Sequence, residues 1–151
     1  MTIKQQIDAD LKTAMLAGDK VLTTTLRGVR AAILNVEIAE NKRDTGLSDE
    51  EVISLMRKEA KKRQESAELF NQGGNLEKAA AEAAEKLVIE KYLPAQMDDE
   101  ALKNLVEAAI TETGAVSMQD MGKVIGLVKS RAGAEADGGR IASLVKSRLS
   151  I

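Results

Sequence analysis

The chain contains one proline in 151 residues and no sustained alternation of apolar and polar residues, and this constrains its fold more than any other feature. A half-buried strand needs that alternation, so the sequence offers no candidate for a sheet. Strong helix formers dominate instead: Ala, Leu, Glu and Lys. We therefore predict an all-α fold. Its clearest break falls at Pro94, because a proline keeps the preceding Leu93 out of helical geometry.

Residues that can cap a helix N-terminus recur along the chain and predict seven helices. Thr2 with Gln5 and Ser48 with Glu51 have capping-box spacing. The remaining predicted starts are Asp19, Asn75, Asp98, Ser117 with Asp120, and Asp137. Predicted stops are Gly18, Gly73-Gly74 and Gly114. Four longer helices precede Pro94 and three short ones follow it, so we predict an N-terminal helical domain over 1–93 and a C-terminal helical domain over 94–151.

Two of these predicted helices have features that bear on packing. Gly28 lies inside the second helix, where it costs about 1 kcal/mol relative to alanine and indicates a close crossing by another helix. The fourth helix is rich in alanine and charge, and has only a thin apolar stripe. That stripe consists of Leu76, Ala80, Ala83 and Leu87.

Missing residue types exclude several classes of function. The chain has no Cys and no His, which excludes disulfides, thiolate catalysis and Cys-based zinc sites, and removes the commonest general base. It has no Trp, and Phe70 and Tyr92 are its only aromatic residues, so it has no platform for stacking single-stranded bases. We find no apolar run long enough for a membrane span and no signal peptide, and expect a cytoplasmic protein with no membrane partner.

Charge is unevenly distributed along the chain. The net charge of −2 combines −6 over residues 1–121 with +4 over 122–151. A basic end favours contact with a polyanion, although solvated helix faces would give the same pattern. A second basic cluster, Arg57, Lys58, Lys61, Lys62 and Arg63, is interspersed with glutamates and is better explained as a solvated helix face.

The basic end contains a repeated decapeptide. GKVIGLVKSR at 122–131 returns as GRIASLVKSR at 139–148. Two helices packed as a hairpin need similar apolar faces, so burial explains the shared Val, Ile and Leu positions. Burial does not explain the shared basic positions or the glycine starts, which could let an anion approach helix N–H groups. The candidate RNA-binding residues are Lys123, Lys129, Arg131, Arg140, Lys146 and Arg148.

Candidate catalytic and metal-binding groups are weak. Asp98-Asp99-Glu100 suits the first turn of a helix, where carboxylates interact favourably with the helix dipole. Glu37 and Glu40 lie one turn apart without a further ligand, and Ser143 with Lys146 matches a Ser-x-x-Lys spacing by chance. We therefore expect no catalytic residue, no cofactor and no metal.

Four segments together resemble the GatB/YqeY family over the whole chain. They are TTTLRGVRAAILNVEIA at 23–39, EKYLPAQMDDEAL at 90–102, GAVSMQDMGKVIGLVK at 114–129 and ADGGRIASLVKSRL at 136–149. The resemblance implies a larger helical domain followed by a small one, the latter similar to the tail domain of the B subunit of glutamine-dependent aminoacyl-tRNA amidotransferase. That tail is implied to hold tRNA, whereas the catalytic part of that subunit has no counterpart here.

The resemblance therefore implies a non-catalytic tRNA-binding module with tRNA as its partner. Family members often have basic residues on either side of the Ala-Asp-Gly motif, where this chain has Glu135 and Gly139. Two alternatives remain open. One is a module that docks on a protein partner, such as a tRNA-charging or amidotransferase subunit; the other is an amidotransferase component, a carbon–nitrogen ligase with glutamine as amide donor.

Overall fold

A computed structural model describes residues 1–150, and every regular element in that range is helical. The elements are α1 (Ile3–Ala17), α2 (Lys20–Ala39), α3 (Asp49–Gln72), α4 (Leu76–Glu90), α5 (Asp99–Thr113), α6 (Met121–Ala132) and α7 (Gly138–Leu149), with short 3₁₀ turns η1 (Met118–Asp120) and η2 (Gly133–Glu135). The predicted all-α class is thus confirmed. The chain divides into two compact units, Met1–Leu93 and a second that begins at Pro94.

The helices begin where the capping residues predicted. The side chains of six N-cap residues each accept a hydrogen bond from a backbone N–H in the first helical turn: Thr2, Asp19, Ser48, Asn75, Asp98 and Asp137. Gly18 and Gly114 end α1 and α5 in the left-handed conformation, at φ 72° and 67°. At the predicted Gly73-Gly74 stop, the left-handed residue is Gly74 alone, at φ 78°. Asp120 differs, because η1 precedes α6 and its carboxylate accepts the N–H groups of Val116 and Ser117.

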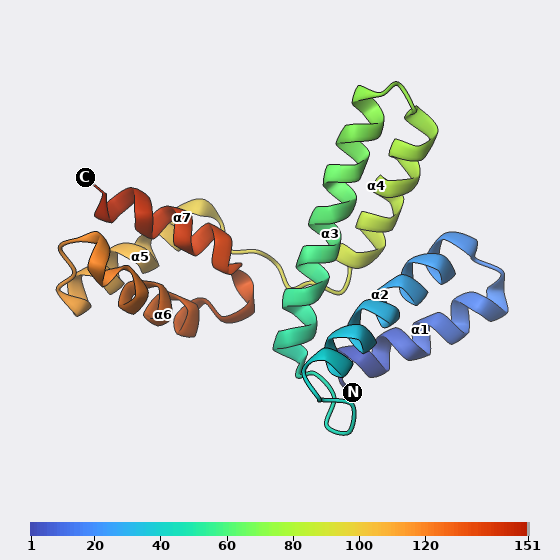
Figure 1. The fold of residues 1–151 in the computed structure, drawn as a ribbon, viewed down its shortest axis with the longest axis horizontal. Coiled ribbons are helices and arrows are strands. Elements are labelled where there is room, and N and C mark those ends of the chain that lie inside the picture. The colour runs from blue at the N-terminus through green and yellow to red at the C-terminus, as the bar shows by residue number, and fades with distance from the viewer. Residues whose placement is uncertain (151) are drawn as a thin grey trace. The chain divides into compact units, whose positions relative to one another are not determined.

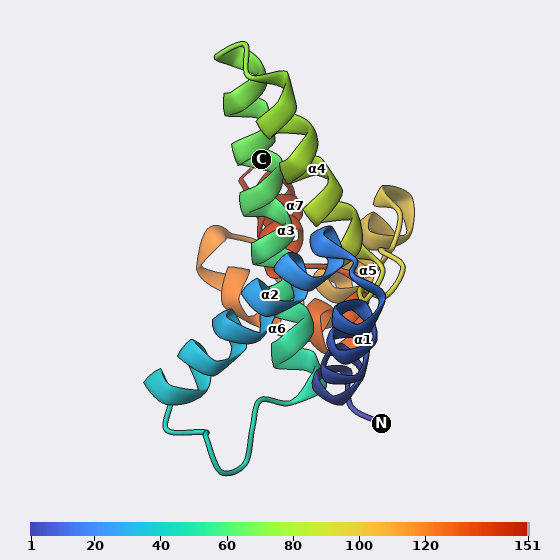
Figure 2. The same ribbon diagram turned by 90° about the vertical axis from the view of Figure 1, so that its right-hand side faces the viewer.

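The first unit consists of two helix pairs, α1 with α2 and α3 with α4. Figures 1 and 2 both show α3 and α4 side by side, with the end that joins them extending beyond α1 and α2. The core lies where the pairs cross, and its fully buried members are Ile7, Leu26, Val29, Ile33, Val52, Met56 and Ile89. Burial of these aliphatic side chains stabilises the crossing by roughly 1.5–3 kcal/mol each.

Helix α4 packs through a different face from its thin apolar stripe. Ala79 and Ile89 are its buried residues. Leu76 and Leu87 are instead 69% and 61% exposed. Since an Ala-rich helix offers apolar contact in several directions, the contacts with α2 and α3 choose the face, and the stripe stays in solvent.

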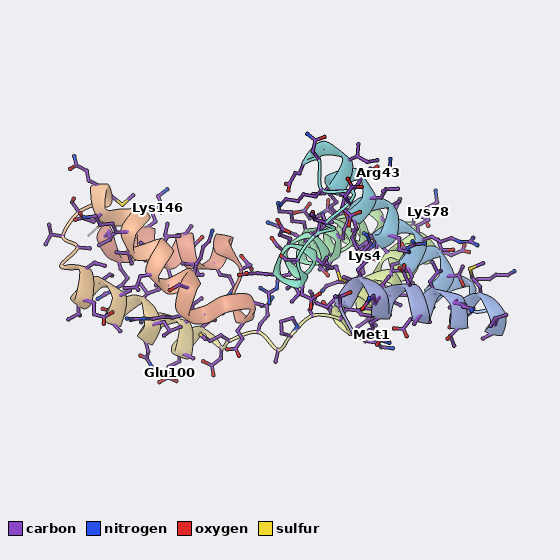
Figure 3. The ribbon with its side chains drawn as sticks, turned by 90° about the horizontal axis from the view of Figure 1, so that it is seen from below. Met1, Lys4, Arg43, Lys78, Glu100 and Lys146 are labelled. Carbon is purple, nitrogen blue, oxygen red and sulfur yellow. The ribbon has the colours of Figure 1, made fainter. Side chains whose placement is uncertain are left out.

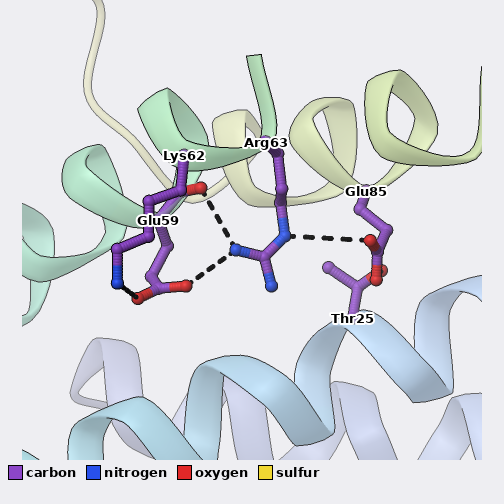
Figure 4. A network of polar contacts seen from close by, with 5 residues as sticks. All are labelled: Thr25, Glu59, Lys62, Arg63 and Glu85. Carbon is purple, nitrogen blue, oxygen red and sulfur yellow. Dashed lines mark hydrogen bonds and ion pairs between the residues drawn. The ribbon is translucent and has the colours of Figure 1, made fainter. Parts of the chain in front are cut away.

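A polar network joins three helices of the first unit (Figure 4). Arg63 of α3 donates to Glu59 at 2.7 Å, and its Nε lies 4.0 Å from Glu85 of α4. The buried Thr25 hydroxyl of α2 lies 3.5 Å from the same Glu85 carboxylate. A Cβ on Gly28 would lie 3.4 Å from an Arg63 nitrogen, an ordinary contact with the end of a long side chain from α3, so the close helix crossing predicted from that glycine stays a prediction.

The second unit has an aliphatic core formed by α5, α6 and α7. Its buried residues are Leu102, Val106, Ala109, Val124, Val128, Ala132, Ala136, Ile141, Val145 and Leu149. The repeated decapeptide supplies equivalent positions to this core, with Val124 and Val128 in α6 matched by Ile141 and Val145 in α7. The Met97 N–H donates to the Glu135 carbonyl at 2.7 Å, which ties the start of the unit to η2.

Candidate nucleic-acid interface

The six predicted RNA-binding cations lie on α6 and α7, which run in opposite directions in Figure 1. Five have exposed side chains, and Arg140 is half-buried. The apolar residues between these cations point into the core and hold each helix in place. The basic residues lie on the parts of each helix that face away from the core. The two helices therefore hold these cations on one small rigid scaffold.

The three arginines of the set all pair with carboxylates of α5. Arg131 pairs with Glu112 and Arg148 with Glu107. Arg140 pairs with Asp99 at 2.8 Å and also lies 3.4 Å from the Gln96 side-chain oxygen. Each arginine thus connects α5 to α6 or α7, which gives it a structural partner that sequence spacing could not reveal.

The three lysines of the set, which we call the lysine set (Lys123, Lys129 and Lys146), differ from the arginines. All three are exposed, and within residues 1–150 none forms an ion pair with a carboxylate. Lys146, whose side chain is exposed, is labelled in Figure 3. Lys123 lies near Asp120, whose pKa is held below its usual range mainly by the N–H groups of Val116 and Ser117 and further by the Lys123 charge. Three cations in the set are thus available to an outside anion.

The N-terminus of α7 is partly occupied by the chain itself. The Asp137 carboxylate accepts the Arg140 N–H at 2.9 Å, so a phosphate cannot take that donor without displacing it. Lys129 reaches across from α6, and a Cβ on Gly138 would lie 3.0 Å from its Cε and 3.2 Å from its Nζ. Glycine at 138 therefore leaves room for the Lys129 ammonium beside the first turn of α7.

The net charge of the whole second unit is closer to zero than the net charge of its last two helices. From Pro94 onward the sequence has seven Lys and Arg against eight Asp and Glu, a net charge of −1. The acidic residues include the α5 carboxylates that neutralise the arginines. The basic character of residues 122–151 therefore survives at the surface mainly through the lysine set.

Three of the other candidate groups, Asp98, Asp99 and Glu37, have structural partners. Asp98 caps α5 by accepting the Ala101 N–H at 2.7 Å, and Asp99 holds Arg140. Glu37 is buried and accepts a hydrogen bond from Lys4 at 2.7 Å. That bond holds the pKa of Glu37 below its usual range, with help from the Leu47 N–H and against the effect of burial. Among the described residues, no group of three or more carboxylates is arranged to hold a metal ion.

A hollow of about 390 Å³ in the first unit lies beside Tyr92, a residue that the sequence singled out only as a rare aromatic. The Tyr92 hydroxyl donates a hydrogen bond to Asp10, across 82 positions of the chain. Burial, and then this bond, raise the pKa of Tyr92, which keeps the hydroxyl protonated near neutral pH. Tyr92 therefore joins α1 to the segment that directly follows α4.

Comparisons with known proteins cover most of the chain. None of the helices formed by residues 1–150 is long and apolar enough to cross a bilayer. "Altered inheritance of mitochondria protein 41, mitochondrial" of Clavispora lusitaniae is 34% identical over 103 residues, which cover 66% of this chain and 58% of that protein. A model of the Yqey-like protein family matches residues 4–149. The chain therefore belongs to the Yqey-like protein family.

Proposed function

We propose that the second unit is a non-catalytic tRNA-binding module and that the lysine set makes its principal contacts with RNA phosphates. The observation that carries the proposal is the division of the basic residues: the arginines are held by α5, whereas Lys123, Lys129 and Lys146 are exposed and unpaired. A surface lysine without an ion pair does not have to leave a carboxylate partner when it meets a phosphate. Its counterions are released on binding, which favours association at low salt.

Folded RNA fits this surface better than a single strand. The second unit has no aromatic residue, so it cannot stack bases, but rigid helices can present lysines to the phosphates of a duplex. The resemblance to the tail of the amidotransferase B subunit supports tRNA as the folded RNA. The cytoplasmic location stays a prediction, since the name of the relative places that protein in mitochondria.

The arginines have a smaller role in this proposal. A phosphate that approached Arg131, Arg140 or Arg148 would have to replace an α5 carboxylate, and the released carboxylate would then repel the RNA. We therefore assign these arginines mainly to the fold of the second unit. This assignment narrows the six candidates of the sequence to three principal contacts.

The experiment compares two full-length variants that each lose three positive charges. One replaces the lysine set with glutamine, and the other replaces Lys58, Lys61 and Lys62, exposed lysines of α3, with glutamine. We expect the first to weaken tRNA binding by at least tenfold at low salt and the second to weaken it by less than threefold. Circular dichroism of both variants checks that the helices remain.

Equal losses in the two variants would show a diffuse charge effect and would contradict a site on α6 and α7. Unchanged affinity in the lysine-set variant would remove RNA binding from this surface. If wild-type protein bound no tRNA but retained a protein partner after ribonuclease treatment in high salt, the tRNA proposal would fail in favour of a protein-docking module.

A further inference from the structure

The thin apolar stripe of α4 lies in solvent with no partner from the first unit. It contains two leucines, Leu76 and Leu87, that are 69% and 61% exposed, with exposed Ala80 and Ala83 between them. The rest of the exposed α4 surface is charged or alanine. An apolar seam on a charged helix is the pattern by which one helix packs against another.

Other helices occupy other sides of α4 and leave the stripe accessible. At 100° per residue, the stripe is centred roughly 110° from the direction of the buried Ala79 and Ile89. Glu85, which faces Thr25 of α2, lies on nearly the opposite side of the helix from the stripe. Within the first unit, neither α2 nor α3 therefore covers this seam.

The spacing of the stripe is the same in both directions along the helix. Its steps are Leu-x₃-Ala-x₂-Ala-x₃-Leu, the alternation of four and three residues that a helix-pairing seam requires. If a second α4 lies antiparallel across it, Leu76 meets Leu87 of the second copy, and Ala80 meets Ala83 of the second copy. A two-fold interface needs such a self-complementary surface, and the small central alanines let the two helices approach closely.

The charges beside the stripe suit the same antiparallel arrangement. Glu77 and Lys91 lie on the same side of the stripe, at opposite ends of α4, and within residues 1–150 neither forms an ion pair. An antiparallel partner brings the Glu77 end of each helix beside the Lys91 end of the other. A parallel partner would place the Glu77 residues of the two copies on opposite sides of the seam, and likewise the Lys91 residues, so that Glu77 would not meet Lys91.

From these observations we propose that two copies of this chain associate through an antiparallel α4–α4 contact centred on Ala80 and Ala83. A helix of 15 residues is about 22 Å long, and the contact buries about 1,000 Å² or less in total, at the low end for specific interfaces. The dimer is consequently weak, with a dissociation constant of roughly tens to hundreds of micromolar. This association does not depend on RNA binding.

Sedimentation equilibrium over a wide concentration range tests the association. We expect the average mass of the wild-type protein to rise toward twice the monomer mass at about 0.5 mM. Replacing both Leu76 and Leu87 with glutamate should lower the association constant at least tenfold, while leaving helix content intact because glutamate is a good helix former. The matched control changes Leu69, 67% exposed on α3, and Leu16, 82% exposed on α1, to glutamate and should dimerise like wild type.

Cysteine cross-linking then tests the register, since the chain has no cysteine of its own. A mixture of Ala80→Cys and Ala83→Cys chains should form a disulfide-linked dimer severalfold faster than either variant alone. Faster self-linking of Ala80→Cys would indicate parallel helices and overturn the antiparallel contact. A wild-type protein that stays monomeric at 0.5 mM, or a leucine double variant that dimerises like wild type, would overturn the proposal.

Discussion

The two units differ in whether they bury a charged group. The first unit buries Glu37 and Thr25 and connects its helices through ionic contacts, including Lys4 with Glu37 and Arg63 with Glu85. The buried core of the second unit is entirely aliphatic, and within residues 94–150 no charged side chain is buried. A buried charge therefore helps to specify how the first unit packs, whereas the ion pairs that connect the helices of the second unit lie at the surface around an apolar core.

This difference bears on where we propose that an outside anion binds. A cation inside a network already has a carboxylate, and removing it from that network leaves a partner uncompensated. Of the six basic residues on α6 and α7, the three arginines have carboxylate partners and the lysine set has none. Within the second unit, the lysine set is therefore the part of the predicted basic surface that no carboxylate neutralises.

The largest expected effect comes from a cavity in either core. Ile33→Ala and Ile141→Ala each remove a fully buried side chain, one in each unit, and each should cost about 3 kcal/mol of unfolding free energy. Because the cores are separate, we expect the loss to fall on the mutated unit. Amide hydrogen exchange measures this directly, and equal loss of protection in both units after either change would contradict separate cores.

The second-largest expected effect comes from removing the buried charge of Glu37 in the first unit. Glu37→Gln leaves Lys4 without its partner and should lower the unfolding free energy by about 2 kcal/mol at pH 7. The folded-state pKa of Glu37 lies below its usual value of 4.5, so its contribution is fully present above that value and is lost as the pH falls through the folded-state pKa.

Denaturant titrations of wild type and Glu37→Gln at several pH values between 7 and 3 check this dependence. The gap between the two proteins should narrow once the pH falls below about 4.5. A gap that stayed constant throughout would mean that the Glu37 charge does not stabilise the fold. The matching change in the second unit, Glu112→Gln, removes an exposed carboxylate and should have a much smaller effect at pH 7.

The smallest stability effect belongs to the arginine pairs of the second unit. Replacing Arg131, Arg140 and Arg148 with glutamine breaks three surface ion pairs, and each should cost less than about 1 kcal/mol. Thermal unfolding monitored by circular dichroism measures the sum. A variant as stable as wild type that had also lost most tRNA affinity would contradict the assignment of these arginines to the fold.

Local features of the fold could be predicted from the sequence because they depend on nearby residues. Helix starts at Thr2, Ser48 and Asp98 follow from side chains that reach N–H groups three positions away. The apolar faces of α6 and α7 follow from strong periodicity in Val and Ile. The buried face of α4 could not be predicted in this way. Alanine can pack on any side of a helix, so the contacts with α2 and α3 determine which side of α4 is buried.

Ion pairs between helices could not be predicted for the opposite reason. Arg140 meets Asp99 across 41 positions, and Lys4 meets Glu37 across 33, so no spacing rule connects them. The six basic residues were therefore equivalent in the sequence, and only the fold separates three arginines from three lysines. That separation reduces the candidate site and makes it testable by matched substitutions.

The salt dependence of tRNA binding tests the central claim most directly. For wild type, the logarithm of the association constant should fall linearly with the logarithm of salt concentration. Replacing the lysine set with glutamine should reduce the magnitude of that slope by roughly 2 to 3, as expected for three lost phosphate contacts. The variant at Lys58, Lys61 and Lys62 should keep the wild-type slope. An unchanged slope in the lysine-set variant would contradict the claim that Lys123, Lys129 and Lys146 hold RNA.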